Sequence, residues 1–199
     1  MNETRRPGDR AVLTQLLNDP EPFLAAGDAA NRRIAVAASL HYPHLLDQVV
    51  DLLLTDPEPT VRREFAEVLG LSGRGDFDTL AQALQDDVAE VREAAANALG
   101  ELAAAESVGL LIEHATNDDE DKLVREAAVA ALGAIGDDRA VPALLALLSG
   151  GSPQIRRRCV PSLSVFDGEH IESALREAGR DRNPMVREAA EMVVGRSTD

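Results

Sequence analysis

The chain has 199 residues and a formal net charge of −15, with 45% hydrophobic but only 3% aromatic residues. The hydrophobic content excludes a wholly disordered chain, and the shortage of aromatic residues predicts a thin core of Leu, Val and Ala such as closely packed helices form. The negative charge disfavours nucleic acid and anionic membrane surfaces as partners, because Lys and Arg contacts to phosphate supply most non-specific affinity for a polyanion.

The start of the chain and its cysteine content indicate a cellular compartment. No segment approaches the roughly 18 apolar residues of a membrane span, and residues 1–10 are polar, without the apolar core of a signal peptide. Cys159 is the only cysteine and cannot form an internal disulfide, which is typical of a reducing compartment. We therefore expect a cytoplasmic protein with no membrane association, in which a flexible arm over residues 1–8 precedes a single domain over residues 9–196.

Two kinds of amphipathic helix are predicted to alternate along the chain. The first helix of each pair, the A helix, is predicted at residues 10–17, 44–54, 77–84, 107–115, 140–148 and 169–178. A second helix, the B helix, follows each of them after a loop of turn-forming residues such as Asp56-Pro57-Glu58-Pro59. No part of the pattern indicates a strand, so the chain is predicted to be all-α.

The B helices repeat one pattern. Residues 61–70, 91–100 and 124–133 each begin with Val-Arg and end with Gly, and looser copies follow at Ile155 and Val186. We count the residue before each arginine as position 0; apolar residues at positions 0, 4, 7 and 8 then form one helical stripe. The arginines at position 1 recur every 30 to 33 residues, as Arg32, Arg62, Arg92, Arg125, Arg156 and Arg187. This period predicts an α-solenoid of about six antiparallel helix pairs.

Position 9 of the repeat is usually glycine, and it suggests where the B helices end. A glycine just after the last residue of an apolar stripe is typical of a left-handed C-terminal cap. We therefore predict such caps at Gly70, Gly100, Gly133 and Gly195.

The first and fifth units depart from the repeat. The fifth contains three arginines at 156–158, a proline at Pro161 inside its predicted B helix, and Ser164 in place of the closing glycine. A proline there removes a backbone hydrogen bond and is expected to bend the helix. The departure is either a functional site or sequence drift. An insertion around residues 23–28 distinguishes the first unit, as expected for a repeat that caps the stack.

These features resemble HEAT repeats, in the short form also seen in phycobilin-lyase-like proteins. The shared features are helix pairs of about 31 residues, a Val-Arg opening the second helix, a closing glycine, and an aspartate six residues before the arginine. The resemblance covers roughly residues 9–196 and implies a HEAT-like superhelix. The aspartate is absent from the first and fifth units, where Ala26 and Gly150 take its place, and present in the pairs Asp56 and Arg62, Asp86 and Arg92, Asp119 and Arg125, and Asp181 and Arg187.

The resemblance implies a structural role for these eight charged residues. In a HEAT-like stack each arginine is expected to reach an aspartate in the loop of a neighbouring unit, so that the pairs form a charge ladder with bidentate geometry. Such partly buried pairs set the register of the helices more than they add net stability.

Positions 2 and 6 of the B helices lie opposite the apolar stripe, and the resemblance places the B helices on the concave surface. The resulting mixture of charges favours a protein segment over nucleic acid as the ligand, although a merely solvated face is the other interpretation. The predicted partner-binding residues are Arg33, Arg63, Glu67, Glu93, Asn97, Glu126, Arg157, Arg158, Glu188 and Met192.

No catalytic or metal-binding motif is visible. Some HEAT-like proteins are di-iron hydroxylases that use His-Glu pairs, but this chain has Glu113-His114 and Glu169-His170, in the opposite order and on different helices. The acidic residues 118–121 precede a B helix, where negative charge favours the helix N-terminus. We expect no metal, no cofactor and no enzymatic activity.

The sequence thus favours a monomeric, non-catalytic scaffold or adaptor that binds another protein or peptide segment on its concave face, in the assembly or regulation of a larger enzyme. Two alternatives come from the resemblance. One is handling of a prosthetic group, as in bilin-lyase-like proteins, and the other is DNA binding, as in alkylation-repair HEAT-like proteins. The absence of aromatic residues from the predicted groove opposes the first, and its glutamates oppose the second.

Overall fold

The computed structural model describes residues 7–75 and 77–195, which form helices and connecting loops with no strand. The prediction of six A and B pairs is confirmed. In chain order the pairs are α1 (Pro7–Asn18) and α3 (Ala29–Ala38), α4 (Pro43–Leu54) and α5 (Pro59–Ser72), α6 (Phe77–Ala83) and α7 (Ala89–Glu101), α8 (Val108–Thr116) and α9 (Lys122–Ile135), α10 (Val141–Gly150) and α11 (Pro153–Leu163), and α12 (Glu169–Ala178) and α13 (Pro184–Val194).

The first unit contains the predicted insertion. The inserted segment includes a four-residue helix, α2 (Glu21–Leu24). The segment ends at Asp28, whose side chain accepts a hydrogen bond from the Ala30 amide at the start of α3. Of the arm predicted over residues 1–8, residues 1–6 lie outside the described part of the chain, and α1 begins at Pro7.

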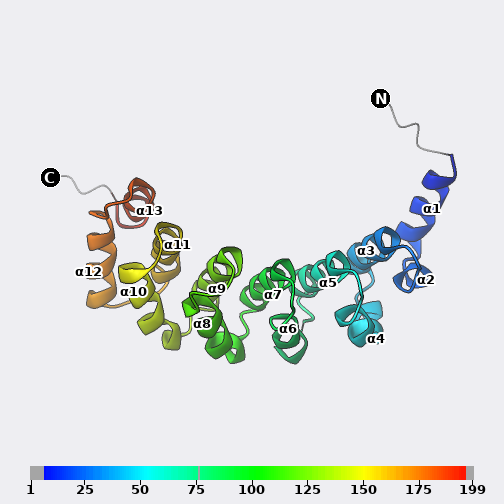
Figure 1. Cartoon of the computed structure of the whole chain (residues 1–199), viewed down its shortest axis with the longest axis horizontal. Helices are drawn as coiled ribbons and strands as arrows, with labels where there is room; N and C mark the ends of the chain where they lie inside the picture. The colour runs from blue at the N-terminus through cyan, green and yellow to red at the C-terminus, as the bar shows by residue number, and fades with distance from the viewer. Residues whose placement is uncertain (1–6, 76, 196–199) are drawn as a thin grey trace.

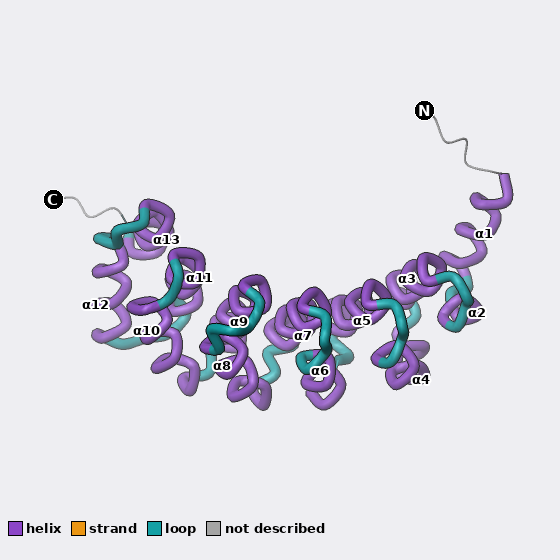
Figure 2. The backbone as a smooth tube through the Cα atoms, viewed as in Figure 1, coloured by secondary structure: helices purple, strands orange, loops and turns teal. Residues whose placement is uncertain are grey.

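The pairs stack into an arc (Figure 1). The B helices lie along its inner, concave edge and the A helices along its outer edge, and the ends of the arc carry the two ends of the described chain. The loops that join each A helix to its B helix follow one another along one side of the stack (Figure 2). Three single-turn 3₁₀ helices lie in connections elsewhere, at Ser39–His41, Ala105–Ser107 and Asp138–Ala140.

Small apolar side chains form the continuous core between the two layers. Val61, Phe65, Val68 and Leu69 of α5 are all at most 3% exposed, as the predicted stripe requires. Alanines dominate the equivalent surfaces of α7 and α9, which allows those helices to approach closely. Cys159 belongs to this core, and burial raises the pKa of its thiol to about 12, so it is an inert core residue.

The prediction of left-handed caps at position 9 is wrong. Gly195 does end α13, with a positive φ of 83° but an extended ψ of 157°. Gly70, Gly100 and Gly133 lie inside α5, α7 and α9, which continue for one or two further residues. The left-handed caps of α5 and α9 are Gly73 and Gly136, with φ of 66° and 68°. The pattern misplaced the helix ends because a glycine next to an apolar stripe serves packing as readily as termination.

Close contact between consecutive B helices explains the repeated glycine. A Cβ atom at Gly70, Gly100 or Gly133 would lie only 2.8, 2.9 or 2.6 Å from the Cα atom of a residue on the next B helix. Those facing residues are Ala98, Ala131 and Ser162. Position 9 is therefore glycine because the next helix backbone occupies the space of a side chain.

The fifth unit loses this contact because its B helix is short. Helix α11 ends at Leu163, position 8 of the repeat, whereas α5, α7 and α9 continue to position 10 or 11. Pro161 lies within α11, and Ser164 at position 9 is a C-cap outside the helix. Val193, at position 7, is consequently 37% exposed in α13, whereas Val68, Ala98 and Ala131 at the same position are at most 3% exposed.

No helix in the described ranges combines the length and the apolar character that crossing a membrane requires.

The glycine contacts yield a test with a matched control. Gly100→Ala is expected to lower the free energy of unfolding by about 1–3 kcal/mol, because the new Cβ forces apart α7 and α9. Gly109→Ala, in α8, meets nothing within 4 Å and is expected to leave stability unchanged or raise it by up to about 1 kcal/mol. Urea unfolding of both variants measures the difference. Equal effects would contradict the packing role of position 9.

Candidate functional site

The position 1 arginines link consecutive helix pairs through two kinds of hydrogen bond. Arg62 donates from Nε and Nη2 to the two carboxylate oxygens of Asp86 in the next unit, at 2.7 and 2.8 Å. Its Nη1 donates to the backbone carbonyl of Asp56 in its own unit, at 2.7 Å. One guanidinium thus holds both the loop before its own helix and the loop of the following pair.

The same arrangement occurs at two further junctions. Arg32 binds both oxygens of Asp56 at 2.7 and 2.8 Å, and Arg156, with a side chain only 3% exposed, binds both oxygens of Asp181 at 2.8 Å. Each aspartate also accepts a hydrogen bond from the backbone amide two residues later, which fixes the loop that carries it. The bidentate pair therefore joins two preorganised groups.

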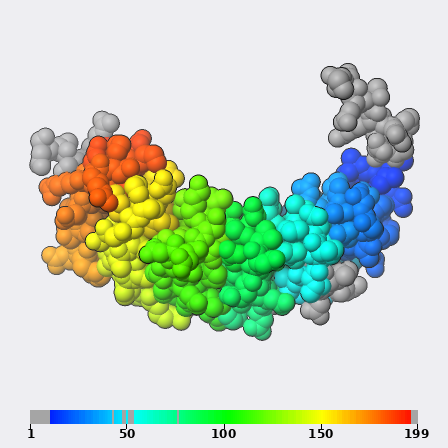
Figure 3. Space-filling view, in the orientation of Figure 1, coloured from blue at the N-terminus to red at the C-terminus, as the bar shows by residue number. Residues whose placement is uncertain are grey.

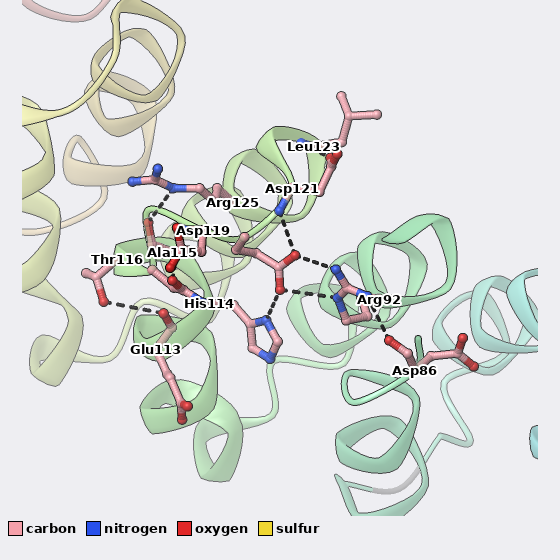
Figure 4. A network of polar contacts seen from close by, with 12 residues as sticks. Asp86, Arg92, Glu113, His114, Ala115, Thr116, Asp119, Asp121, Leu123 and Arg125 are labelled. Atoms are coloured by element: carbon pink, nitrogen blue, oxygen red, sulfur yellow. Dashed lines mark hydrogen bonds and ion pairs between the residues drawn. The ribbon is translucent and has the colours of Figure 1, made fainter. Parts of the chain in front are cut away.

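The third junction corrects the prediction for Asp119. Arg92 reaches Glu120 in the next unit instead, at 2.5 and 3.2 Å, while Asp119 is exposed (Figure 4). His114 Nδ1 also contacts Glu120, at 2.8 Å. The spacing between Arg92 and Arg125, 33 residues, is the longest in the repeat, so the loop of the fourth unit presents a different residue to Arg92. Glu120 can take the place of the aspartate because its side chain is one methylene longer.

Two of the predicted ladder arginines reach no carboxylate in a following unit within the described residues. Arg125 pairs with Asp118 of its own loop, at 2.9 Å, and the carboxylate of Asp118 is 92% exposed. The fifth unit offers it no acidic partner, since Gly151 occupies the corresponding loop and supplies only a carbonyl oxygen to Arg156. Arg187 donates to the carbonyl of Asp181 within the last described unit.

The ladder shifts the pKa values of its carboxylates. Burial alone would raise the pKa of Glu120, but the hydrogen bonds from Arg92, the Asp121 amide and His114 outweigh burial and lower it to about 2. The pKa values of Asp56 and Asp86 are lowered in the same way against burial. At Asp181 the hydrogen bond from Arg156 is the largest cause of the lowered pKa. These carboxylates are charged at neutral pH and engaged by their arginines.

An acid titration tests the third junction. Because the pKa of Glu120 in the folded chain is about 2, below its ordinary 4.5, its stabilising effect is complete above pH 4.5 and is lost as the pH falls towards 2. Glu120→Gln should be less stable than the native chain at pH 7, and this difference should shrink on acidification. Thermal unfolding at a series of pH values measures it. A difference that does not change with pH would contradict the assignment.

Stability measurements distinguish a ladder arginine from an interrupted one. Arg62→Ala leaves the carboxylate of Asp86 partly buried without its partner, so we expect a loss of about 2–4 kcal/mol. Arg125→Ala removes a pair with an exposed aspartate and one hydrogen bond to the Ala115 carbonyl, for which a smaller loss of about 1–2 kcal/mol is expected. Chemical denaturation of both variants gives the comparison, and equal losses would show that the bridge between units is unimportant.

The residues predicted for partner binding lie on the B helices, which line the hollow side of the arc (Figure 3). Several pair with one another or with neighbouring carboxylates. Arg33 lies 3.7 Å from Glu64, and Arg63 donates to Glu67 at 2.9 Å. The exposed members are Arg33, Arg63, Asn97, Arg157, Glu188 and Met192, and the half-buried ones are Glu67, Glu93, Glu126 and Arg158.

Two grooves lie between B helices on this side. The central groove, of about 420 Å³, lies over α5, α7 and α9 and has an alanine-rich floor beside Leu71, Glu67 and Asn97. The second, of about 520 Å³, lies between α11 and α13 and is lined by Arg157, Arg158, Pro161, Met185, Glu188, Ala189, Met192 and Val193. The exposed Leu71 and Met185 were not among the predicted residues. They fall at positions 10 and −1 of the repeat, whereas the concave surface was predicted mainly from positions 2 and 6.

The histidines do not converge. His114 belongs to the ladder, while His170 is exposed on α12. Within residues 7–75 and 77–195, no group of three or more His, Cys, Asp or Glu side chains is placed to hold a metal ion.

A curved stack of helix pairs joined by a repeated arginine defines the chain as an α-solenoid of HEAT type. The family model for HEAT repeats matches residues 46–133 and 77–163, and the chain belongs to the HEAT-repeat family.

Solved structures of similar fold include natural and designed solenoids. YibA of E. coli is 18% identical with a TM-score of 0.65, covering 98% of this chain and 77% of YibA. The CpcE–CpcF complex of phycocyanin lyase from Nostoc sp. PCC7120 is 20% identical with a TM-score of 0.60, covering 95% of this chain and 76% of the other. A designed armadillo repeat protein in complex with the peptide (KR)4 is 16% identical with a TM-score of 0.61, covering 89% and 98%.

Human deoxyhypusine hydroxylase is a relative by sequence. It is 29% identical over 119 residues, which cover 57% of this chain. The match spans about two fifths of the relative's own length, 39%.

Proposed function

We propose that this protein is a non-catalytic scaffold or adaptor that binds a segment of another protein along its concave face. The observation that carries the proposal is the division of roles on the B helices. Positions 0, 4, 7 and 8 form the core, position 1 forms the ladder and position 9 allows close packing. Positions 2 and 6 have no such part in the stack. Position 6 lines the central groove, at Glu67, Asn97 and Ala130, and both positions line the groove between α11 and α13.

The shape and composition of the grooves support a protein segment as the ligand. Both grooves combine an apolar floor with a few charged or amide groups, a composition suited to alternating apolar and polar side chains. The designed armadillo protein mentioned above binds its peptide on a solenoid of the same general fold. Affinity would come from side chains that enter the two grooves and specificity from the charged groups at their edges.

The alternatives receive less support from the same surface. The grooves are lined by no aromatic side chain that could stack on a tetrapyrrole, which disfavours prosthetic-group handling. The glutamates on the concave side oppose the phosphate backbone of DNA. The match to the human hydroxylase spans 39% of that protein, and among the described residues no group of three or more His, Cys, Asp or Glu side chains is placed to hold a metal ion.

Charge reversal on each face tests the proposal. Arg63→Glu and Glu93→Arg, on the concave side, are expected to reduce capture of the native partner from a lysate of the source cells by about tenfold, as for substitutions at the centre of an interface. Glu113→Arg, exposed on the outer helix α8, serves as the control and should leave capture unchanged. Quantitative mass spectrometry of the captured proteins provides the measurement.

The melting temperature of each variant is recorded first, so that a folding defect is not mistaken for lost binding. Loss of capture with Glu113→Arg, together with normal capture by both concave variants, would overturn the proposal and place the interface on the convex side.

A further inference from the structure

The groove between α11 and α13 differs from the rest of the concave surface in both packing and charge. Because α11 ends at Leu163 and carries no glycine at position 9, α13 lacks the close contact that glycine allows at the three preceding junctions. Val193, at the core position 7, is therefore 37% exposed. Met192 and Met185, at positions 6 and −1 of the same helix, are 78% and 45% exposed beside it.

The apolar part of this groove is suited to side chains of varied shape. Pro161, Met185, Met192 and Val193 contribute its apolar surface. Methionine is flexible and polarizable, so a surface with two methionines can adjust to Leu, Ile, Met or Phe side chains. Exposed apolar groups gathered in one groove mark a binding surface more often than a solvated one.

The charged part of the groove has unsatisfied donors. Arg157 is exposed at its edge and forms no ion pair with any described residue, unlike Arg33 and Arg63 at the same position of earlier units. The Nε atom of Arg158 is buried and has no hydrogen-bond acceptor in the described structure. Its guanidinium has one distant carboxylate neighbour, Glu126, whose oxygen is 3.9 Å from Nη2. A carboxylate entering from the groove would meet donors from both arginines.

The groove also contains one carboxylate of its own. Glu188 is exposed on α13, opposite the arginines of α11. The carboxylate of Glu188 repels an acidic side chain of the ligand from α13, so that side chain has to lie against α11. The neighbouring apolar side chains of the ligand then lie against the methionines of α13. The arrangement therefore favours one orientation of the ligand.

From this geometry we infer that the groove between α11 and α13 binds a protein segment in which an acidic residue lies next to large aliphatic side chains. The carboxylate binds Arg157 and Arg158, and the aliphatic side chains occupy the apolar surface beside Met185 and Met192. This inference rests on the proposed concave-face function and names the chemistry of the segment. It sets this protein apart from the designed solenoid that binds (KR)4, because the charge of the preferred segment is the opposite.

Three labelled peptides provide the test with the full-length chain. Each is a fluorescein-labelled 12-residue peptide with the same leucines beside one variable position and serines elsewhere, and the variable position carries Glu in the first, Gln in the second and Lys in the third. Fluorescence anisotropy is expected to show the Glu peptide binding about tenfold more tightly than the Gln peptide, with no binding of the Lys peptide. Equal binding of the Glu and Gln peptides would overturn the inference.

Substitutions separate the charged from the apolar contribution. Arg157→Gln should remove most of the preference for Glu over Gln, while Met192→Ser should weaken both peptides equally. Arg176→Gln, an exposed arginine on the outer helix α12, changes the same residue type outside the concave surface and should affect neither. Because all three side chains are exposed, the variants are expected to fold, which their circular dichroism melting curves check. An unchanged Glu preference in Arg157→Gln would contradict the assignment.

The results also separate this inference from the broader proposal. If the Glu peptide fails to bind but Arg63→Glu and Glu93→Arg still lose the native partner, the chemistry assigned to this groove is wrong and the concave-face function stands. If the native chain instead forms dimers that Arg157→Gln abolishes, as light scattering would show, the occupant is a second copy and the inference is overturned.

Discussion

The bidentate bond between the arginine of one helix pair and the carboxylate of the next is the interaction on which this structure depends. HEAT-type pairs contact only their neighbours, so the shape of the whole arc is the sum of the junctions between them. Each complete junction fixes the next loop at two oxygens, as Arg62 does with Asp86, and the glycine at position 9 lets the two B helices meet. These two constraints set the register of the stack and leave the concave side chains unused.

The same constraints explain why the fifth unit differs. The fifth unit contains Gly150 at the sequence position where other units offer an acid, so Arg125 pairs with Asp118 of its own loop. The B helix of the fifth unit, α11, also ends early. The interrupted pair lies at the junction between α9 and α11, whereas the junction between α11 and α13 keeps the bond of Arg156 to Asp181. The early end of α11 is therefore the change that shapes the second groove. The junction between α9 and α11 still keeps one unusual contact, because the hydroxyl of Ser162 donates to the carbonyl of Val129 at 2.9 Å. The unit that departs most from the repeat thus forms one wall of the groove that contains Met185 and Met192.

The sequence predicted the helix pairs well and their contacts less well. Periodicity located all six A helices to within a few residues, since local apolar patterns determine them. The sequence wrongly predicted Gly100 as a cap and Asp119 as a ladder residue. Both residues lie where one helix pair meets the next, and the pattern within one repeat does not determine those contacts. The groove between α11 and α13 depends on how far α11 extends and how closely α13 approaches. Neither the length of α11 nor its separation from α13 follows from the composition of a single repeat. Pro161 and Ser164 nevertheless identified the fifth unit as irregular.

Hydroxyl-radical footprinting of the protein with and without its captured partner is the most direct test of the central claim, that the concave side chains not used by the fold carry the function. Binding is expected to lower the oxidation rates of Leu71 and Met192, which are 65% and 78% exposed in the two grooves. No change is expected at Val165, which is 57% exposed in the loop after α11. Protection of Val165 without protection of Leu71 and Met192 would contradict the claim.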